Sequence, residues 1–192
     1  MDYKNDNLYI DKIVHHKDDK AFALLMQKHM AMAYNIAFRI VRNREDAQEV
    51  TQDAFVKIYN AIPGFRGDSK FSSWMYRIVY NQALSSIRKK SILSEAGTID
   101  DHEEVHDESA CDEALQLDKA TRKKYIGQAI SGLEETESVI ITLYYMNDES
   151  AEEISIITGL SVSNVKVKLF RARKKIQVAL QRMLKDELNE IL

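Results

Sequence analysis

Cysteine, proline and glycine are all scarce in this chain of 192 residues, which contains one cysteine, one proline and six glycines. Cys111 stands alone and cannot form a disulfide within the chain, so a disulfide-bonded secreted scaffold is excluded. Because proline and glycine interrupt helices, their scarcity, together with 45% hydrophobic residues, predicts an all-α protein.

Long apolar segments and targeting signals are missing as well. No run of about 18 apolar residues exists to span a bilayer. The first residues, MDYKNDNLYIDK, have no cationic stretch followed by an apolar one, as a signal peptide would. We therefore expect a soluble cytoplasmic protein without membrane insertion. A chain of this length can fold into one or two domains with their own cores.

The net charge of −3 hides a strong segregation of charge. Ten Asp or Glu and no Lys or Arg lie between Ser91 and Asp118, so the rest of the chain has 27 cations against 20 anions, a net of +7. Residues 92–118 are also poor in apolar side chains and lack a helical period, which predicts a flexible acidic linker. Two basic helical domains, 1–91 and 119–192, joined by an acidic linker are typical of a nucleic-acid-binding protein.

Two short helices across a tight turn are predicted between Ser150 and Lys175. Ser150 and Glu153 have the spacing of a capping box at the start of the first helix. Gly159 is placed to end that helix, because glycine adopts left-handed dihedrals without a steric clash, and Ser161 can cap the second. This layout is that of a helix-turn-helix, whose second helix enters the major groove of DNA.

The second of these helices is rich in polar and cationic side chains. Val162, Val165, Leu169 and Ile176 recur at helical spacing and form its apolar face. Early residues of such a helix reach base edges while flanking cations hold phosphates. The alternative is a helical hairpin with a solvated basic face. The side chains that project between the apolar positions are Ser163, Asn164, Lys166, Lys168, Arg171, Arg173, Lys174 and Lys175.

The first ninety residues predict a bundle of amphipathic helices. His29 lies on the apolar face of one of them, where we expect a packed core residue and not a ligand. Residues 62–69, IPGFRGDS, hold the only proline and two of the six glycines, which predicts a loop. Helical spacing of apolar residues predicts helices over 8–20, 21–43, 45–61 and 70–90, with a break at 42–44.

The predicted helix 45–61 has an acidic outer face. Asp46, Glu49 and Asp53 follow one another at spacings of three and four residues, with Gln52 and Lys57 beside them. Such a stripe is either an ordinary solvated face or a docking surface for a basic partner helix.

Aromatic and cationic side chains are interleaved around the predicted helix 70–90. Phe65, Phe71 and Tyr76 lie among cations, a combination that suits single-stranded nucleic acid, because bases stack on rings while cations follow the phosphates. The alternative is that the rings belong to the core. We expect Trp74, Ile78, Leu84 and Ile87 to point inward, and the opposite face to hold Arg77, Asn81, Ser85 and Arg88, extended by Lys89 and Lys90.

One metal-like motif lies in the predicted linker. His102 to His106 reads HEEVH, the spacing that places two imidazoles on one helical face to bind zinc, with a glutamate as the base of a peptidase. No apolar helix or third ligand supports it, and a metal site needs groups around its ligands that hold them in place. We therefore predict no metal, no cofactor and no enzymatic activity.

Three segments in this order carry a family resemblance: REDAQEVTQDAFVKIYNAIPGF (44–65), KFSSWMYRIVYNQALSSIRKK (70–90) and SGLEETESVIITLYYMNDESAEEISIITGLSVSNVKVKLFRARKKI (131–176). The chain resembles the extracytoplasmic-function group of bacterial RNA polymerase sigma factors over nearly all of its length outside the linker. The resemblance implies a non-enzymatic subunit that directs core RNA polymerase to promoter DNA, and it implies an anti-sigma factor as a further partner.

The resemblance also implies roles for individual residues. The residues expected to contact core polymerase are Asp46, Glu49, Gln52, Asp53 and Phe55. Those expected at the minus-ten element, where a base is captured from the opened strand, are Phe65, Lys70, Phe71, Trp74, Arg77, Asn81, Arg88 and Lys89. Those expected at the minus-thirty-five element are Ser163, Asn164, Lys166, Lys168, Phe170, Arg171 and Lys174.

The chain departs from the family's pattern in two places. Ser85 stands where relatives commonly have an acid, and Val167 and Lys168 stand where Ser-Arg is frequent. A rival interpretation is a stand-alone helix-turn-helix regulator that binds duplex DNA through its second half only. The aromatic and cationic block around Trp74 favours the sigma factor, because a regulator of duplex DNA has no use for a surface that captures single strands.

Overall fold

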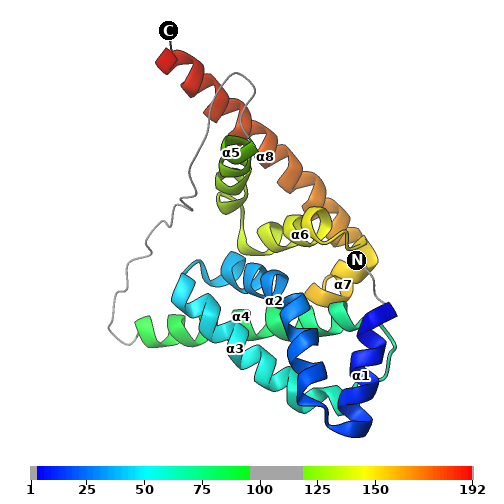
Figure 1. Cartoon of the computed structure of the whole chain (residues 1–192). Helices are drawn as coiled ribbons and strands as arrows, with labels where there is room; N and C mark the ends of the chain where they lie inside the picture. The colour runs from blue at the N-terminus through cyan, green and yellow to red at the C-terminus, as the bar shows by residue number, and fades with distance from the viewer. Residues whose placement is uncertain (1–3, 96–118, 192) are drawn as a thin grey trace.

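The computed structural model describes residues 4–95 and 119–191, and all regular elements in these two ranges are helices (Figure 1). The prediction of an all-α protein is confirmed. The predicted linker, with Cys111 and the His102–His106 motif, lies from residue 96 on outside the described residues. The elements are α1 (Lys4–His16), α2 (Asp19–Val41), α3 (Arg44–Ala61), the short 3₁₀ helix η1 (Ile62–Gly64), α4 (Phe71–Glu95), α5 (Lys119–Ser131), α6 (Glu135–Met146), α7 (Ala151–Thr158) and α8 (Val162–Ile191).

The first half of the molecule is a bundle in which α2, α3 and α4 pack on one another and α1 lies against α2. Leu25 and Ile36 from α2, Ile58 from α3 and Met75 from α4 are fully buried at its centre. Asn43 accepts a hydrogen bond from the Asp46 backbone N–H (3.0 Å), which caps α3 after the predicted break.

The predicted first helix, 8–20, was wrong at its end. Helix α1 stops at His16, because Lys17 takes a left-handed φ of 50° and Asp18 caps the next helix. The Asp18 carboxylate accepts from the backbone N–H groups of Lys20 and Ala21 at 3.0 and 3.1 Å. The sequence contains the signal for this cap, an Asp directly before a helical run. The predicted bounds missed it because they rested on apolar periodicity alone.

The predicted inward face of α4 also needs correction. The spacing of Trp74, Ile78, Leu84 and Ile87 predicted the core-facing stripe, but these side chains are only half-buried. Ser72, at the start of the helix, is buried where it donates to Glu149 in the turn before α7, and Ser73 beside it is buried as well. The fully buried apolar stripe lies one residue further round and consists of Met75, Tyr76, Val79, Tyr80 and Ala83.

In the second half, α8 packs against α5, α6 and α7. Val139, Ile140 and Leu143 of α6 contribute buried side chains to the core of this half, and Ile154 of α7 and Val165 of α8 join them. Figure 1 shows α8 running past α5 toward the C-terminus. None of the described helices combines the length and apolarity that a membrane crossing requires.

The two halves share an interface. Helix α7 packs on α4 and α6 packs on α2, so the α6–α7 corner sits directly on the first bundle (Figure 1). The buried apolar residues therefore form one continuous cluster through both halves. Charge and periodicity predicted two domains without saying how they meet.

Candidate nucleic-acid interface

The predicted helix-turn-helix is present, and the residues predicted to cap its two helices do so. The Ser150 backbone N–H donates to the Glu153 carboxylate at 2.7 Å, and the Glu153 N–H donates to the Ser150 hydroxyl at 3.2 Å, which completes the capping box. Gly159 ends α7 with a φ of 74°. Ser161 accepts from the Asn164 N–H at 3.3 Å at the start of α8.

The second helix of this unit is held by buried contacts and turns a polar face to solvent. Val165, Leu169 and Ala172 of α8 are buried, and they pack with Ile154 and Ile157 of α7. The spacing of these contacts fixes the direction of the opposite face. That exposed face contains Ser163, Asn164, Lys166, Val167, Phe170, Arg171 and Lys174.

A shallow hollow of about 540 Å³ lies on this face, lined by Ser163, Lys166, Val167 and Phe170. The Phe170 side chain is 68% exposed, which is unusual for a large apolar ring. Val167 is 43% exposed beside it and was not among the predicted contact residues. Its place one helical turn before Phe170 and Arg171 is the sequence signal that could have identified it. Cations flanking an apolar patch match the mixture of phosphates and thymine methyl groups in a major groove.

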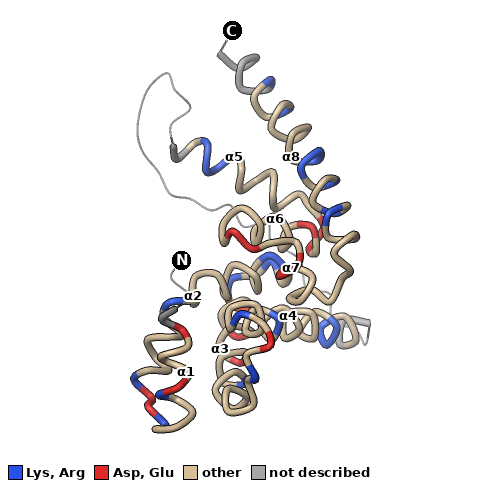
Figure 2. The backbone as a smooth tube through the Cα atoms, turned by 90° about the vertical axis from the view of Figure 1, so that its right-hand side faces the viewer, with Lys and Arg blue, Asp and Glu red and all other residues tan. Residues whose placement is uncertain are grey.

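Lys168 does not join this face. Its side chain is 20% exposed and its ammonium lies 3.4 Å from the Glu134 carboxylate. Arg173 likewise turns toward α6, where its Nε donates to the Tyr145 hydroxyl at 2.8 Å. Lys175 pairs at 2.6 Å with Glu137. These three cations tie α8 to its own half, so the sequence overestimated how many of them face outward. Figure 2 shows the cations spaced along α8.

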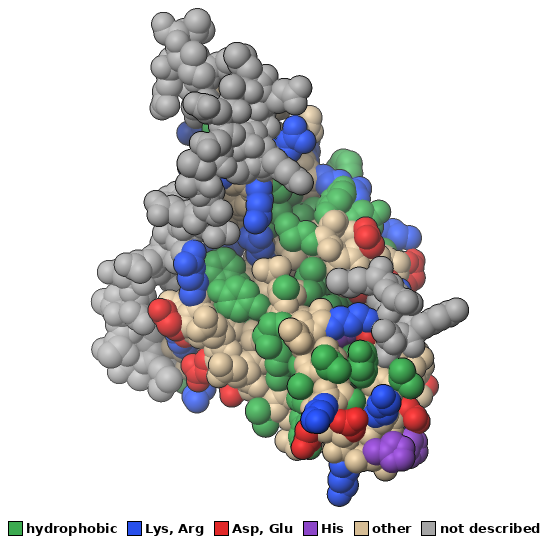
Figure 3. All heavy atoms as spheres, in the orientation of Figure 1, with side chains coloured by type: hydrophobic (Ala, Val, Ile, Leu, Met, Phe, Trp, Pro, Cys, Tyr) green, Lys and Arg blue, Asp and Glu red, His purple; other side chains and the backbone are tan. Residues whose placement is uncertain are grey.

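The predicted strand-contact residues of α4 fall into two groups. Arg77, Asn81, Arg88 and Lys89 are exposed along one side of the helix. The aromatic rings are not exposed in the same way. Phe71 is 4% exposed and lies in the core, so the prediction that its ring is free to stack on a base does not hold in this structure. Figure 3 shows Lys and Arg side chains on the surface of both halves.

An aromatic cluster supports the loop before α4. The Phe65 ring lies 5.5 Å from Phe71 and 5.2 Å from Trp74, measured between ring centroids. Phe65 and Trp74 are half-buried, which leaves part of each residue at the surface. Gly67 has a φ of 76°, a conformation that glycine adopts without strain, and it sits in the exposed part of this loop.

The acidic stripe on α3 is only partly open. Glu49 and Gln52 are exposed. Asp46 pairs with Lys90 of α4 at 2.5 Å, and Asp53 accepts from the Gln82 amide at 3.1 Å. Phe55, the last member of the predicted core-contact set, is half-buried against the bundle. Two of the four polar side chains are therefore engaged with α4, which the sequence could not indicate.

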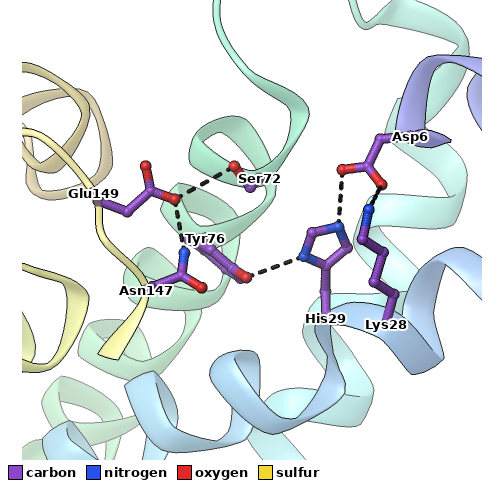
Figure 4. Close-up of polar contacts among 7 residues, drawn as sticks. All are labelled: Asp6, Lys28, His29, Ser72, Tyr76, Asn147 and Glu149. Atoms are coloured by element: carbon purple, nitrogen blue, oxygen red, sulfur yellow. Dashed lines mark hydrogen bonds and ion pairs between the residues drawn. The ribbon is translucent and has the colours of Figure 1, made fainter. Parts of the chain in front are cut away.

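A polar cluster lies where α7 meets α4 (Figure 4). Glu149 is 1% exposed; its carboxylate accepts from the Asn147 amide at 2.7 Å and from the Ser72 hydroxyl at 3.5 Å. Burial and then the Glu153 carboxylate raise the pKa of Glu149 to about 7. Burial acts to raise the pKa of Glu153 too, but its ion pair with Lys70 and further hydrogen bonds lower it to about 2.

A second buried network joins α1 to α2 and α4 (Figure 4). His29 is 2% exposed; its Nε2 lies 3.1 Å from the Asp6 carboxylate and its Nδ1 lies 3.0 Å from the Tyr76 hydroxyl. Lys28 pairs with Asp6 at 2.6 Å. The prediction that His29 is a packed core residue is confirmed. Among the described residues no group of three His, Cys, Asp or Glu is arranged to hold a metal.

The comparisons with known proteins agree with this geometry. The family model Sigma-70 region 2 matches residues 25–92 and the model Sigma-70, region 4 matches residues 123–176. The chain is 32% identical over 175 residues to the RNA polymerase sigma-H factor of Pseudomonas aeruginosa, and 31% identical over 175 residues to the ECF RNA polymerase sigma-E factor of Escherichia coli K12. Each alignment covers 88% of this chain and 91% of the relative. The chain belongs to the extracytoplasmic-function (ECF) sigma factors.

Solved sigma factor structures share the fold. CnrH in complex with the cytosolic domain of CnrY has a TM-score of 0.61 at 21% identity, covering 94% of this chain and 97% of that one. RpoE of Bartonella quintana, in complex with the anti-sigma factor NepR, has a TM-score of 0.64 at 21% identity, covering 81% and 95%. As an ECF sigma factor, the chain is a non-enzymatic, DNA-binding subunit of transcription initiation. Family membership thus favours this function over the stand-alone regulator.

Proposed function

We propose that this sigma factor reads two promoter elements with the two exposed polar faces described above. The exposed face of α8 enters the major groove of the minus-thirty-five element, and the exposed side of α4 holds the opened strand at the minus-ten element. The observation that carries this division is the presence, in one chain, of a helix-turn-helix face and a separate cationic face on α4. A duplex-only protein needs the first and has no use for the second.

The α8 face is suited to reading duplex DNA. Ser163 and Asn164 lie in its first turn, where side chains reach base edges, and Lys166 and Arg171 lie beside them to contact phosphates. Phe170 supplies an apolar surface for thymine methyl groups. Lys168 is left out of the proposed contacts because Glu134 holds it.

The α4 face is suited to holding a single strand. Arg77 and Asn81 are exposed one turn apart and Arg88 is exposed two turns further on, so the three side chains lie along one side of the helix, where a strand backbone can follow them. Phe65 and Trp74 are partly exposed at the start of that path. Unstacking a base takes a few kcal/mol, which contacts of this kind offset.

For core polymerase, we propose docking through the open part of the α3 stripe. Glu49, Gln52 and Asp53 are the exposed members, and complementary charge on a basic partner helix would orient them. The relatives of similar fold were solved in complex with CnrY and with the anti-sigma factor NepR, which supports an anti-sigma factor as a partner here too. A role in transcription places the protein in the cytoplasm.

The test is open-complex formation with bacterial core polymerase on promoters that this protein selects from its source genome. Permanganate reactivity of unpaired thymines reports opening. We compare Glu49→Lys, Arg77→Ala and the control Lys12→Ala, which removes an exposed cation of α1 that belongs to neither face. The expected result is that Glu49→Lys lowers affinity for core, Arg77→Ala lowers opening at saturating core, and Lys12→Ala changes neither.

Opening that does not require the protein would overturn the proposal. So would tight binding of duplex DNA together with unchanged opening in Arg77→Ala, because the α4 face would then need another role.

A further inference from the structure

Helix α1 is connected to the loop before α4 by two separate routes. The first is direct, because α1 packs on η1 as well as on α2. The short helix η1 leads straight into Phe65, whose backbone N–H donates to the Ile62 carbonyl oxygen at 2.9 Å, and Ile62 itself is fully buried. The place of Phe65 therefore depends on an element against which α1 packs.

The second route runs through the core of the first bundle (Figure 4). Asp6 of α1 is 2% exposed, and its carboxylate lies 3.1 Å from His29 Nε2. Because an ionised carboxylate only accepts hydrogen bonds, this ring nitrogen carries the proton and donates. The His29 ring meets the rings of Phe71 and Tyr76 edge-on, at centroid distances of 6.1 and 5.8 Å. Asp6 thus orients a ring that contacts the first residue of α4.

Phe71 links this network to the proposed base-capture surface. Its ring is 4% exposed and lies 5.5 Å from both Phe65 and Trp74, measured between centroids. Phe65 and Trp74 lie 5.2 Å apart and are half-buried, so the three rings form one packed cluster that reaches the surface. Phe71 is the inner ring of this cluster, and the two outer rings rest on it.

The chemistry of the network suits positioning better than plain burial. An apolar side chain in place of His29 would fill the same space without a fixed orientation. Hydrogen bonds to Asp6 and, at 3.0 Å, to the Tyr76 hydroxyl instead hold the imidazole in one orientation. Rings that capture a base must be placed precisely, and such precision comes from residues behind them whose own rotamers are locked.

We propose that Asp6 and His29 are positioning residues for base capture at the minus-ten element. Through Phe71 they set the Phe65 and Trp74 rings, while α1 also holds η1, from which Phe65 emerges. Asp6 and His29 are each 2% exposed, so they act on the strand only through the rings that they support. This inference rests on the proposed function, in which Phe65 and Trp74 meet the captured base.

The first experiment measures how strongly promoter opening depends on the captured base. Holoenzyme is assembled from core polymerase and each sigma variant, and permanganate reactivity is measured on promoters in which each base of the non-template minus-ten strand is removed in turn. Wild type should lose most opening at one position, because a sugar without a base offers no ring to stack. The ratio of opening on the intact promoter to opening on that abasic promoter is the readout. This ratio is independent of the amount of folded protein.

Replacing the positioning residues should lower this ratio. Asp6→Ala and His29→Leu should reduce it roughly threefold to tenfold, because misplaced rings lose part of the stacking with the base. Asp6→Asn keeps an oxygen that can accept from His29 Nε2 and should retain most of the ratio. Tyr76→Phe removes one hydroxyl from the network and should lower the ratio roughly twofold, which decides the matter if the larger changes prevent assembly.

Ile40→Ala is the control for stability. Ile40 is 2% exposed in α2, about three helical turns from His29, so the variant weakens the same bundle without touching the network. Unchanged ratios in the network variants would overturn the proposal, and so would an equal fall in Ile40→Ala. A wild-type ratio near one at every position would show that no base is captured. That result is seen in wild type alone and would overturn the proposed role of the loop together with this inference.

A second measurement uses the free protein. Trp74 is the only tryptophan of the chain, so intrinsic fluorescence reports on this ring cluster directly. Asp6→Ala and His29→Leu should lower the fluorescence anisotropy of Trp74, because its ring gains mobility when Phe71 is no longer held. Ile40→Ala should leave the anisotropy as in wild type. Equal anisotropy in wild type and in both network variants would contradict the proposal.

Discussion

Lys70 and Glu153 form an ion pair that joins the two halves of the molecule, and the same Glu153 carboxylate accepts the Ser150 N–H in the capping box of α7. One side chain therefore serves a local function, the start of a helix, and a long-range one, the seating of that helix on α4. The Glu153 side chain is 15% exposed and Lys70 is 41% exposed, so solvent screens the pair in part.

The two functions of Glu153 can be separated by substitution. Glu153→Gln keeps a side chain that can accept the Ser150 N–H but removes the charge that Lys70 faces. It should weaken the contact between α7 and α4, with a loss of unfolding free energy below about 1 kcal/mol. Glu153→Ala removes the cap as well and should lose about 1 kcal/mol more. Urea denaturation measures both losses, and equal stability of the two variants would contradict this division.

The stability of the folded protein should depend on pH through Glu149. Burial and the Glu153 carboxylate raise its pKa from 4.5 to about 7, while Lys70 and Asn147 act to lower it. The folded protein thus holds a proton that the unfolded chain releases, so the contribution of Glu149 to stability is fully present below the usual pKa and is lost as pH rises through about 7. Glu153, with its lowered pKa, contributes stability above pH 4.5 and loses that contribution only toward pH 2.

The measurement is the free energy of unfolding by urea from pH 5 to pH 8, where Glu153 stays ionised. We expect this free energy to fall by more than about 1 kcal/mol in wild type as pH rises, relative to Glu149→Gln. Glu149→Gln is the matched control, because its amide is neutral at every pH and close in shape to the protonated carboxyl. A wild-type profile as flat as that of Glu149→Gln would contradict the prediction.

The Asp6, His29 and Tyr76 network should stabilise the first bundle by holding α1. Burial would raise the pKa of Asp6, but hydrogen bonds from His29 and Lys28 lower it below 3.8, so this contribution is present at neutral pH and is lost as pH falls below that value. Asp6→Ala leaves His29 buried without its acceptor and should destabilise the protein by about 3 kcal/mol. Tyr76→Phe removes one hydrogen bond and should lose about 1 kcal/mol. Urea denaturation at pH 7 gives both values; the reverse order would show that the hydroxyl matters more than the carboxylate.

The sequence predicted what depends on near neighbours in the chain. The capping box of Ser150, the left-handed Gly159 and the cap at Ser161 each rest on residues within four positions, and all three are present. The buried set Val165 and Leu169 follows from helical spacing.

Contacts between residues that are distant in the chain could not be predicted from the sequence. Periodicity says which side of a helix is apolar, but not which helix covers the other side. Nothing near Ser72 in the chain indicates that Glu149, 77 positions later, lies against it and that its hydroxyl is buried. Lys168 was predicted to contact DNA, because no local pattern in the sequence shows that Glu134 lies beside it.

That difference between Lys166 and Lys168 provides a matched test of the α8 face. Lys166 is 64% exposed beside the hollow, whereas Lys168 is 20% exposed and paired with Glu134 at 3.4 Å. A cation that contacts a phosphate releases a counterion, so removing it reduces the dependence of binding on salt. Lys166→Ala should therefore lower the slope of log affinity against log salt by about 1 on minus-thirty-five duplex, measured by fluorescence anisotropy. Lys168→Ala should leave the slope as in wild type and lower thermal stability slightly, through loss of its pair with Glu134. If both variants lowered the slope equally, Lys168 would leave Glu134 on binding DNA, and the exposed face would be wider than this structure shows.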